Sequence, residues 1–570
     1  MKAHSKAGRQ QKGGAMKRMP IGVDDFKKVV EDYYYVDKTL FIKELLDNHG
    51  DVTLITRPRR FGKTIAMSML SYFFSISQKE NASLFDHLAI ASVDDGGYLK
   101  ERNRYPVIFL TMKDVQNDTW TMLYDAFRLA ISAEYNKHLY LLEGEMLSDY
   151  EKLFFRKILT GEASPAEYQV SVAYLSDYLA RYYHEKPIIL IDEYDAPLQY
   201  AYQCGFYEDA ISYFRTWYNK TLKGNASMNF AVLTGVLRVA KESIFSGLNN
   251  LEVDSVLADR YSDTFGFTLE DIETICRDYH AEVAMADVKA WYDGYRFGNQ
   301  DIYNPWSVIN FFKNHGKAMP YWVNTSDNRI VRYMLAGTDR RRLQQLEQLL
   351  EGKTVEATLH ESVIYDDIKE DRSALLTMLL TTGYLTIAGK SKDIYNRYFL
   401  KIPNEEIKQL YHSEIMSHIS QGHTSSEFDD LFSALLSGDK ETFSDLLSQI
   451  IQRTVSIYDA ANKECFYHGF LLGMMACFGH PNYTIRSNRE SGFGRFDLAI
   501  FPKDKTRAGV VMEFKYARRK EDLSKEAAAA ICQIQDRAYT TELMAEGIEK
   551  VWLYGIAFHE KEICVERISG

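Results

Sequence analysis

The segment Gly62-Lys63-Thr64 is the first place in this sequence where residue types and spacing predict chemistry. A short apolar run at Val52–Ile55 precedes it and a helical pattern follows it, which is the strand, loop and helix context of a phosphate-binding loop. Backbone N–H groups at the helix start and the Lys63 ammonium would hold the β- and γ-phosphates, and the Thr64 hydroxyl would ligate Mg²⁺. We therefore predict an ATP site here.

The start of this loop departs from the usual G-x-x-x-x-G-K-T pattern. Arg57 stands where the first glycine is expected, and Pro58 after it favours an extended backbone. The loop must therefore enter its turn in another way, and a chance match to G-K-T is the competing interpretation. Arg59 and Arg60 would add positive charge where the triphosphate lies, so we count both among the candidate ATP-binding residues.

Two acidic residues follow in the sequence IILIDE, residues 188–193. Four apolar residues predict a strand that is buried on both faces, as in a parallel sheet. Asp192 would lie at the carboxyl end of that strand, where α/β sheets bind ligands, and would hold Mg²⁺ through water. Glu193 would polarise the attacking water as a general base. A solvated strand end is the simpler alternative, and the upstream G-K-T motif makes it less attractive.

Two more strands fit the same sheet, at Val107–Thr111 and Phe230–Thr234. Thr234 at a strand end would suit a sensor of the γ-phosphate, and Arg238 one helical turn later could contact phosphate. For Arg238 a surface salt bridge is an equally good interpretation. Alternating strands and helices predict a doubly wound α/β domain with a parallel sheet and flanking helices.

The second chemically loaded region is near the C-terminus. Glu513 and Lys515 lie two residues apart in one expected strand, so they share a face, and Asp497 lies in the neighbouring strand. Two carboxylates can bind Mg²⁺ or Mn²⁺ ions that activate water, and Lys515 would stabilise a pentavalent phosphate. Gln533, on the following helix, could position that water or a backbone phosphate. Charged residues at strand ends are commonplace, so each signal is weak by itself.

The order of elements around these residues is more specific than any one of them. We expect a helix, three strands, a long helix and a fourth strand, at residues 462–478, 483–488, 496–501, 509–515, 524–545 and 551–558. Glu464 and His468 fall in the first helix. Packing of polar groups within the helix is one interpretation of both residues.

The sequence pattern divides the whole chain into four parts. Residues 1–18 form a basic tail that we expect to be disordered, and residues 19–325 form the P-loop domain. Residues 326–458 read as a helical spacer whose helix, hairpin and helix order also has the outline of a winged helix. Residues 459–570 form the C-terminal α/β domain. Residues 291–312, rich in Gly, Asn, Pro and aromatics, are expected to close the P-loop domain without taking part in a site.

Composition and charge limit the classes of protein to which this chain can belong. The chain has 570 residues, 46% of them hydrophobic, which is ample for several cores. Its formal net charge of −11 argues against a global basic surface for nucleic acid. Six scattered cysteines suggest neither a disulfide framework nor a zinc site. There is no apolar run of transmembrane length and no secretory h-region, so we expect a cytoplasmic protein without membrane contact.

Several motifs together resemble a known family. They are IGVDDFKKVVE, YYVDKT, RPRRFGKT, LIDEYD, TGVLRVAKESIFSGLNN, WYDGYRFG and GRFDLAIF with VVMEFK. The chain resembles AAA-ATPase-like proteins that join a P-loop ATPase to a C-terminal domain of the PD-(D/E)XK nuclease superfamily, whose fold is that of restriction endonucleases. The resemblance places Asp497, Glu513 and Lys515 on the nuclease motif and makes an arginine-rich phosphate loop unremarkable. It also makes Glu464 a candidate for an extra metal ligand, because some relatives carry one in the opening helix.

Three function classes stay open at this point. The chain could be an ATP-dependent nuclease acting on nucleic acid, with DNA favoured over RNA. It could instead be a nucleotide-switched signalling or scaffold protein, or an ATPase whose nuclease-like domain only recognises nucleic acid. The retained pair of carboxylates and the lysine argue against inert recognition. ATP and Mg²⁺ are the expected cofactors, with Mn²⁺ as a substitute in the C-terminal domain, and self-association is left open.

Overall fold

The computed structural model of this chain describes residues 17–238, 244–245, 249–279, 285–322, 345–346, 348–360, 371–394, 396–419, 425–454, 471, 474, 482–491 and 494–570. The chain divides into two units. Unit 1 comprises Met1–Asn324, His360–Ile368 and Leu380–Thr386, and unit 2 comprises Thr325–Leu359, Lys369–Leu379 and Ile387–Gly570. The four-part division drawn from the sequence stays a prediction.

Five parallel strands form the centre of unit 1, in the order β2-β3-β4-β1-β5. They are β2 (Val107–Thr111), β3 (Ile188–Asp192), β4 (Ala231–Gly235), β1 (Val52–Thr56) and β5 (Leu251–Asp254). Every residue of β1, β3 and β4 is buried, which is why these segments are continuous apolar runs in the sequence. The parallel sheet confirms the predicted α/β class.

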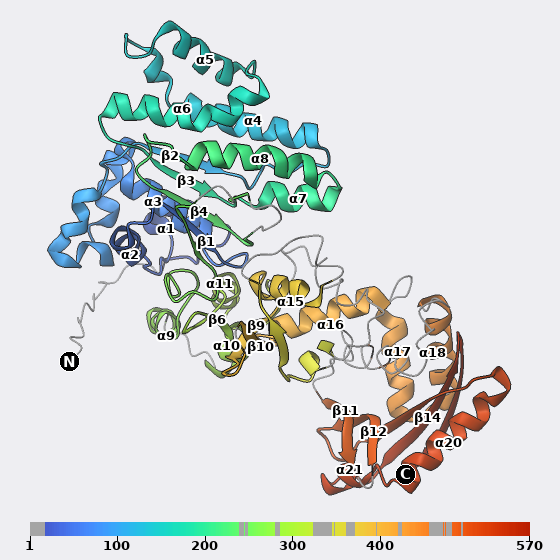
Figure 1. Cartoon of the computed structure of the whole chain (residues 1–570). Helices are drawn as coiled ribbons and strands as arrows, with labels where there is room; N and C mark the ends of the chain where they lie inside the picture. The colour runs from blue at the N-terminus through green and yellow to red at the C-terminus, as the bar shows by residue number, and fades with distance from the viewer. Residues whose placement is uncertain are drawn as a thin grey trace. The chain divides into compact units, whose positions relative to one another are not determined.

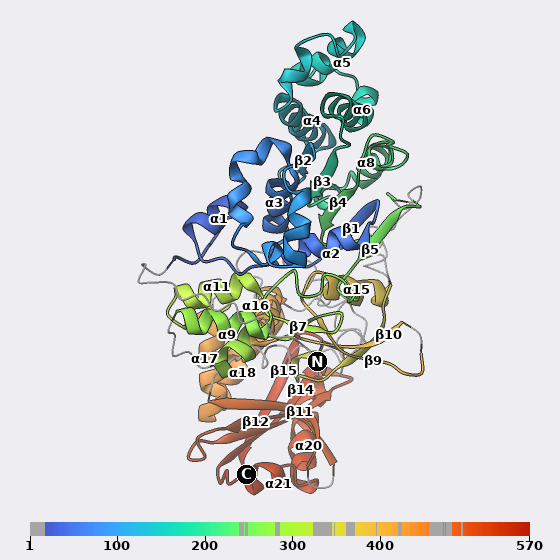
Figure 2. The same cartoon turned by 90° about the vertical axis from the view of Figure 1, so that its left-hand side faces the viewer.

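Helices cover both faces of this sheet, with α3 on one side and α8 on the other (Figures 1 and 2). Helix α6 begins at Pro165, directly after Ser164, whose side chain forms a capping box with Glu167. The helices of this part are α1 (Phe26–Asp32), α2 (Leu40–Asn48), α3 (Lys63–Phe74), α4 (Trp120–Asn136), α5 (Asp149–Thr160), α6 (Pro165–Tyr183), α7 (Ala196–Cys204) and α8 (Tyr207–Leu222).

A smaller subregion follows β5 within unit 1. Its elements are α9 (Leu269–Asp278), α10 (Met285–Tyr292), β6 (Tyr295–Phe297), β7 (Gln300–Ile302) and α11 (Pro305–Lys313). The strands β6 and β7 form an antiparallel hairpin. The three helices bury Ile272, Val288 and Phe311 in one shared apolar cluster, so this subregion has a core of its own beside the parallel sheet.

The segment Leu380–Thr386 belongs to unit 1 although the residues on either side of it belong to unit 2. The Arg296 backbone N–H, in β6, donates to Thr386 Oγ1 at 3.0 Å. Gly383 has a left-handed φ of 90°, and a Cβ there would lie 3.1 Å from Pro58 Cβ. Glycine therefore both accepts this backbone conformation and allows the close approach to the phosphate-binding loop.

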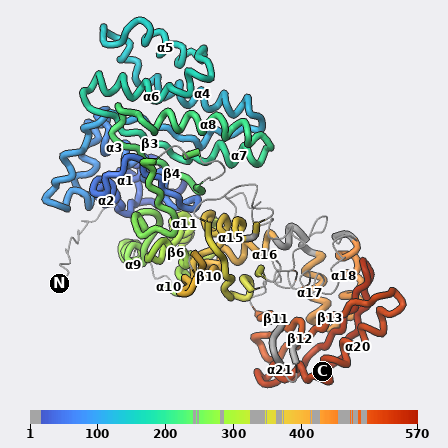
Figure 3. The backbone as a smooth tube through the Cα atoms, in the orientation of Figure 1, coloured from blue at the N-terminus to red at the C-terminus, as the bar shows by residue number. Residues whose placement is uncertain are grey.

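The middle of the chain carries a three-stranded sheet in the order β8-β10-β9, in which β8 and β10 are antiparallel. Figure 3 traces the orange helices that follow it. The elements are β8 (Val355–Thr358), α15 (Arg372–Thr381), β9 (Thr386–Lys390), β10 (Arg397–Lys401), α16 (Glu405–Ile419), α17 (Ser425–Ser437) and α18 (Lys440–Thr454). The expected order of helix, two strands and helix is present, and β8 adds a strand that the sequence pattern did not indicate.

The C-terminal part of unit 2 is a five-stranded mixed sheet in the order β11-β12-β13-β14-β15. The strands are β11 (Tyr483–Ser491), β12 (Gly494–Pro502), β13 (Gly509–Tyr516), β14 (Val551–His559) and β15 (Glu562–Ser569). Only β13 and β14 are parallel to each other. Helix α20 (Leu523–Asp536) packs on these two strands so closely that a Cβ at Gly555 would lie 2.3 Å from the Ala527 carbonyl oxygen.

This sheet matches the predicted fold class, with two corrections to the elements of its domain. The single helix expected at residues 524–545 is two helices, α20 and α21 (Thr541–Ala545), because Ala538 takes a left-handed φ of 52° between them. The strand β15 was not expected at all, and neither was β5 in unit 1. The helix predicted at residues 462–478 lies outside the described residues except for positions 471 and 474. Within the described part of the chain, no helix is long and apolar enough to cross a membrane.

Candidate functional site

The candidate ATP site lies where β1 passes through the loop 57–62 into α3. Gly62 caps the helix with a left-handed φ of 87°, and no atom lies within 4 Å of where its Cβ would be. A glycine there removes the strain of this conformation and leaves the helix N-terminus open. The first N–H groups of α3 have no partner within the helix, so they are available to an anion such as phosphate.

Lys63 is buried at the start of α3. Its Nζ donates to the carbonyl oxygens of Arg57 at 2.9 Å and Pro58 at 2.8 Å, so the lysine side chain is bound by the backbone of the preceding loop. Burial lowers the pKa of Lys63, and the nearby charges of Glu193 and Asp192 oppose that shift. The ammonium is thus held by neutral acceptors, which a phosphate oxygen could replace with a stronger charge-assisted hydrogen bond.

Asp192, at the carboxyl end of β3, is fully buried between two hydroxyl groups. Thr64 Oγ1 donates to Asp192 Oδ2 at 2.8 Å, and Thr234 Oγ1 donates to Asp192 Oδ1. The structure therefore brings together three residues that the sequence assigned to Mg²⁺ binding and γ-phosphate sensing. Hydroxyl and carboxylate oxygens are ligands that suit Mg²⁺, which keeps most of its waters, so this donor set fits the ion.

Glu193 follows Asp192 and has a left-handed φ of 53°, which is uncommon for a residue other than glycine. Burial raises the pKa of its carboxyl group, and the Lys63 ammonium opposes that shift. Its strained backbone and its place beside Lys63 are typical of functional sites, where such conformations are concentrated. This geometry is compatible with the predicted role as general base.

The residues just after Glu193 anchor the turn that follows β4, and the sequence analysis assigned them no role. The buried Asp195 carboxylate accepts hydrogen bonds from Val236 N at 3.0 Å and Leu237 N at 2.8 Å. Tyr194 Oη donates to the Leu237 carbonyl oxygen at 2.5 Å. Arg238, a predicted phosphate contact, follows this anchored turn directly. The second aspartate of LIDEYD was the only sequence signal that could have pointed to this anchor.

The turn also depends on a glycine. A Cβ at Gly235 would lie 2.6 Å from both Asp195 Oδ1 and the Tyr194 ring, which leaves no room for a side chain. The end of β4 can therefore approach the end of β3 closely because residue 235 is glycine.

The arginines of the loop do not all face the predicted phosphate site. Arg59 Nη2 donates to Gln199 Oε1, on α7, at 2.9 Å. The Arg60 guanidinium lies over the ring of Trp306, on α11, with its carbon 3.9 Å from the ring centroid. Trp306 belongs to residues 291–312, which the sequence analysis placed outside any site. That segment in fact packs against the loop, so its aromatic residues help to shape it.

The candidate nuclease site lies where β12 and β13 separate. The antiparallel pairing of these strands runs from Ile500 with Val510 to Leu498 with Met512. At Asp497, the residue before Leu498 in β12, a side chain replaces the backbone pairing: Phe514 N donates to Asp497 Oδ2 at 2.7 Å. The carboxylate thus lies beside the part of β13 that carries the other two motif residues.

Glu513, Lys515 and Gln533 form one hydrogen-bonded cluster at this point. Lys515 Nζ donates to Gln533 Oε1 at 2.6 Å, and Gln533 Nε2 donates to Glu513 Oε1. Lys515 Nζ lies 3.6 Å from Glu513 Oε1, and Gln533 Nε2 also contacts Tyr539 Oη at 3.3 Å. The structure therefore brings together all the C-terminal catalytic candidates, and Tyr539 is an additional polar neighbour that the sequence did not suggest.

The Glu513 carboxylate is only 3% exposed, and its Oε2 has no hydrogen-bond partner among the described residues. Burial, together with the repulsion of Asp497, raises its pKa to about 8, and Lys515 opposes the shift. A buried carboxylate oxygen with no partner, next to a second carboxylate, is the arrangement that a divalent cation would relieve. Mg²⁺ or Mn²⁺ therefore fits Asp497 and Glu513.

Other potential ligands do not complete this site within the described residues. No group of three or more His, Cys, Asp or Glu side chains suited to a metal occurs in that part of the chain. Glu464 and His468 lie outside the described residues. A cation at Asp497 and Glu513 would thus rely on water for its remaining ligands, as Mg²⁺ commonly does.

Comparison with protein families finds a match for each of the two domains that carry these sites. Residues 20–245 match the family of predicted AAA-ATPases, and residues 462–568 match the PD-(D/E)XK nuclease superfamily. The chain therefore carries an AAA-ATPase-like domain and a PD-(D/E)XK nuclease superfamily domain, as the motifs indicated. Among curated proteins, it is similar to the "Uncharacterized protein in vnfD 5'region" of Azotobacter chroococcum mcd 1. The two chains are 25% identical over 551 residues, which cover 95% of this chain and 96% of that protein.

Proposed function

We propose that this protein binds and hydrolyses ATP in its AAA-ATPase-like domain and cuts nucleic-acid phosphodiester bonds, preferably in DNA, in its nuclease-like domain. Mg²⁺ serves both reactions, and Mn²⁺ can replace it in the second. The proposal places this chemistry in the cytoplasm. Lys63 and the α3 N-terminus bind phosphate, Thr64 and Asp192 hold the ion, and Glu193 takes the proton of the attacking water.

The observation that carries the proposal is the Glu513 carboxylate. It is buried beside Asp497 with one oxygen unpartnered among the described residues and with a pKa raised to about 8. Two close carboxylates are costly to bury without a proton or a cation between them, and a structural role alone does not require both. When bound, a divalent cation supplies Lewis-acid activation of water and stabilises charge on phosphate. Lys515 lies close enough to share that second task.

The test is a cleavage assay with the full chain. Single- and double-stranded DNA and RNA are incubated with Mg²⁺ or Mn²⁺, each with and without ATP. We expect metal-dependent cleavage that Asp497→Ala abolishes and that Asp504→Ala leaves unchanged, because Asp504 is an exposed carboxylate on the turn between β12 and β13. No cleavage of any polymer under any condition would remove the nuclease half of the proposal.

The nucleotide half is tested separately by calorimetric titration of ATP with Mg²⁺. We expect binding to the wild-type chain and none to Lys63→Ala. Lys79→Ala, which removes an exposed lysine, is the matched control. If the folded wild-type protein does not bind ATP, the loop is not a nucleotide site and this half fails.

A second candidate function is a nucleotide-switched scaffold whose nuclease-like domain binds nucleic acid without cutting it. One observation favours it: Gln533 already bonds both Lys515 Nζ and Glu513 Oε1, so the two groups are engaged with the chain itself. Catalysis would require this contact to open. Binding of DNA without cleavage, retained in Asp497→Ala, would support the scaffold over the enzyme.

A further inference from the structure

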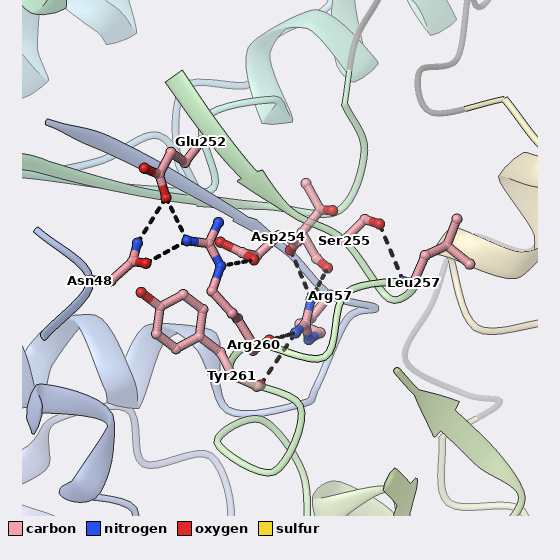
Figure 4. A network of polar contacts seen from close by, with 9 residues as sticks. Asn48, Arg57, Glu252, Asp254, Ser255, Leu257, Arg260 and Tyr261 are labelled. Atoms are coloured by element: carbon pink, nitrogen blue, oxygen red, sulfur yellow. Dashed lines mark hydrogen bonds and ion pairs between the residues drawn. The ribbon is translucent and has the colours of Figure 1, made fainter. Parts of the chain in front are cut away.

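Arg57, which replaces the first glycine of the phosphate-binding loop, points into the protein. Its side chain is fully buried and lies among residues of β5 and of the segment that follows it (Figure 4). The sequence showed a departure from the usual motif at this position, which the family resemblance made unremarkable. In the structure the two terminal nitrogens of the arginine are hydrogen-bonded, while its Nε has no hydrogen-bond partner among the described residues.

Backbone carbonyl groups surround the guanidinium. Its Nη1 donates to the carbonyl oxygens of Thr56 at 2.9 Å and Asp254 at 2.8 Å. Its Nη2 donates to those of Arg260 at 3.3 Å and Tyr261 at 3.2 Å. These four carbonyl groups come from segments about 200 residues apart in the chain. The planar fork of arginine can reach them together, whereas a lysine ammonium could not.

Two aromatic rings complete the cage. The guanidinium carbon lies 5.6 Å from the ring centroid of Phe265 and 5.2 Å from that of Phe297, in β6. The Asp254 carboxylate, by contrast, forms an ion pair with Arg260, whose Nε lies 2.9 Å from Asp254 Oδ1. Arg57 is therefore a buried cation whose direct hydrogen bonds all go to neutral groups.

This environment has a cost in stability. Burial lowers the pKa of Arg57 to about 10, and the charge of Asp254 opposes the shift only through space. Burying a cation against neutral acceptors is less favourable than leaving it in water or pairing it with a carboxylate. Stability alone therefore gives a poor account of this arginine, and a role at the site is the better explanation.

The cage is connected to the nucleotide site through the backbone of Arg57. Arg57 N donates to the Gly235 carbonyl oxygen at 3.1 Å, which ties it to the end of β4. The Arg57 carbonyl oxygen accepts one of the two hydrogen bonds of Lys63 Nζ, at 2.9 Å. Holding the guanidinium thus fixes the carbonyl that holds the lysine.

We propose that Arg57 is a positioning residue of the nucleotide site: its caged guanidinium sets the loop backbone so that Lys63 meets the phosphates, in place of the turn that a first glycine would make. The inference rests on the proposed ATP site. It also explains why the segment from β5 to β6 packs against the loop, since that segment supplies the cage.

The decisive variant is Arg57→Gly, which restores the G-x-x-x-x-G-K-T pattern. If the cage positions the loop, this variant binds ATP with Mg²⁺ about tenfold or more weakly than the wild type, although its motif is more regular. The matched control is Arg104→Gly, which removes an exposed arginine whose ion pair with Glu185 contributes little. Circular dichroism checks that both variants are folded.

A chemical rescue separates positioning from simple destabilisation. Millimolar guanidinium or methylguanidinium should restore much of the ATP affinity of Arg57→Gly, because it can occupy the vacated cage, and should not change Arg104→Gly. Phe297→Leu is a milder variant that keeps Arg57 and removes one ring of the cage, and it should weaken ATP binding severalfold.

Three results would overturn the inference. The first is an Arg57→Gly protein that binds ATP within twofold of the wild type. The second is a loss of affinity that guanidinium does not restore, and the third is Phe297→Leu with unchanged affinity. Absence of ATP binding to the wild type is a different result, since it would refute the nucleotide site itself.

Discussion

The two candidate sites of this chain differ in whether their buried charged groups have hydrogen-bond partners. At the phosphate-binding loop, Lys63 donates to two carbonyl groups and Asp192 accepts from Thr64 and Thr234. In the C-terminal sheet, where β12 and β13 separate, Glu513 keeps an oxygen without a partner in the described part of the chain. The chain itself provides partners for the lysine and the aspartate of the first site, whereas the second site leaves a carboxylate in need of a proton or a cation.

This difference indicates how each site would respond to its ligand. Nucleotide binding at the loop exchanges existing hydrogen bonds for stronger ones, so it should change affinity and geometry more than stability. Metal binding at Asp497 and Glu513 relieves the repulsion between the half-buried Asp497 and the buried Glu513, so it should change stability and proton uptake as well.

The first prediction concerns Glu513→Ala. Loss of this carboxylate should abolish metal binding and lower phosphodiester cleavage roughly a thousandfold, because the cation supplies several kcal/mol of charge stabilisation. Lys515→Ala should keep the metal and slow the chemistry only. ATP hydrolysis by Glu513→Ala serves as the internal control and should match the wild type. Cleavage that survives in Glu513→Ala would show that the second site does not work through a cation.

The second prediction concerns Glu193→Gln. It should keep ATP affinity within about twofold and lower the kcat of hydrolysis roughly a hundredfold, since the change removes the proton acceptor and keeps the shape of the side chain. Steady-state hydrolysis and a separate binding titration measure the two quantities. Equal kcat in both proteins would take Glu193 out of the mechanism.

The third prediction is the pH dependence of the metal effect. The pKa of Glu513 is raised from 4.5 to about 8 in the folded protein, so the native state keeps a proton that the unfolded chain loses between those values. Stability of unit 2 without metal should therefore fall as the pH rises through that window. A divalent cation binds the deprotonated carboxylate and reverses the loss.

We accordingly expect Mn²⁺ to raise the Tm of the C-terminal transition by a few degrees at pH 8 and by less at pH 6. Glu513→Gln should remove both the pH dependence and the metal effect. Calorimetry at the two pH values checks this, and an equal shift in Glu513→Gln would place the metal elsewhere.

The smallest expected effect belongs to Arg60. Because its guanidinium already stacks on Trp306, Arg60→Ala should weaken ATP binding by about threefold or less, within the range of one exposed cation–π contact. Arg59, whose guanidinium donates to the Gln199 amide oxygen, is the useful comparison. A loss of a hundredfold in Arg60→Ala would mean that this arginine leaves Trp306 to bind phosphate.

Strong local patterns made much of this molecule predictable. The strands β1, β3 and β4 are buried throughout, so their sequences are unbroken apolar runs that end in the polar residues of the site. The order of strands and helices in the C-terminal domain was recognisable for the same reason. Strand alternation placed Glu513 and Lys515 on one face, and the order of the strands placed Asp497 beside them.

The features that the sequence pattern did not predict were missed for physical reasons. The strands β5 and β15 lie at sheet edges and are half-buried, so their mixed sequences LEVD and EICVERIS carry no clear apolar signal. The buried cage around Arg57 could not be predicted for another reason. A loop arginine is ordinarily solvated or bound to phosphate, and its cage is built by carbonyl groups of residues far along the chain, which no local pattern reveals.

The return of Leu380–Thr386 to unit 1 has a practical consequence for dividing the protein. A recombinant fragment that stops near residue 324 would contain the whole P-loop sheet, yet it would lose the segment that lies against Pro58 and β6. It would also expose Trp322, whose ring packs 5.2 Å from that of Tyr384. An isolated ATPase fragment should therefore extend to at least Thr386, and shorter ones should aggregate or lose nucleotide affinity for reasons unrelated to catalysis.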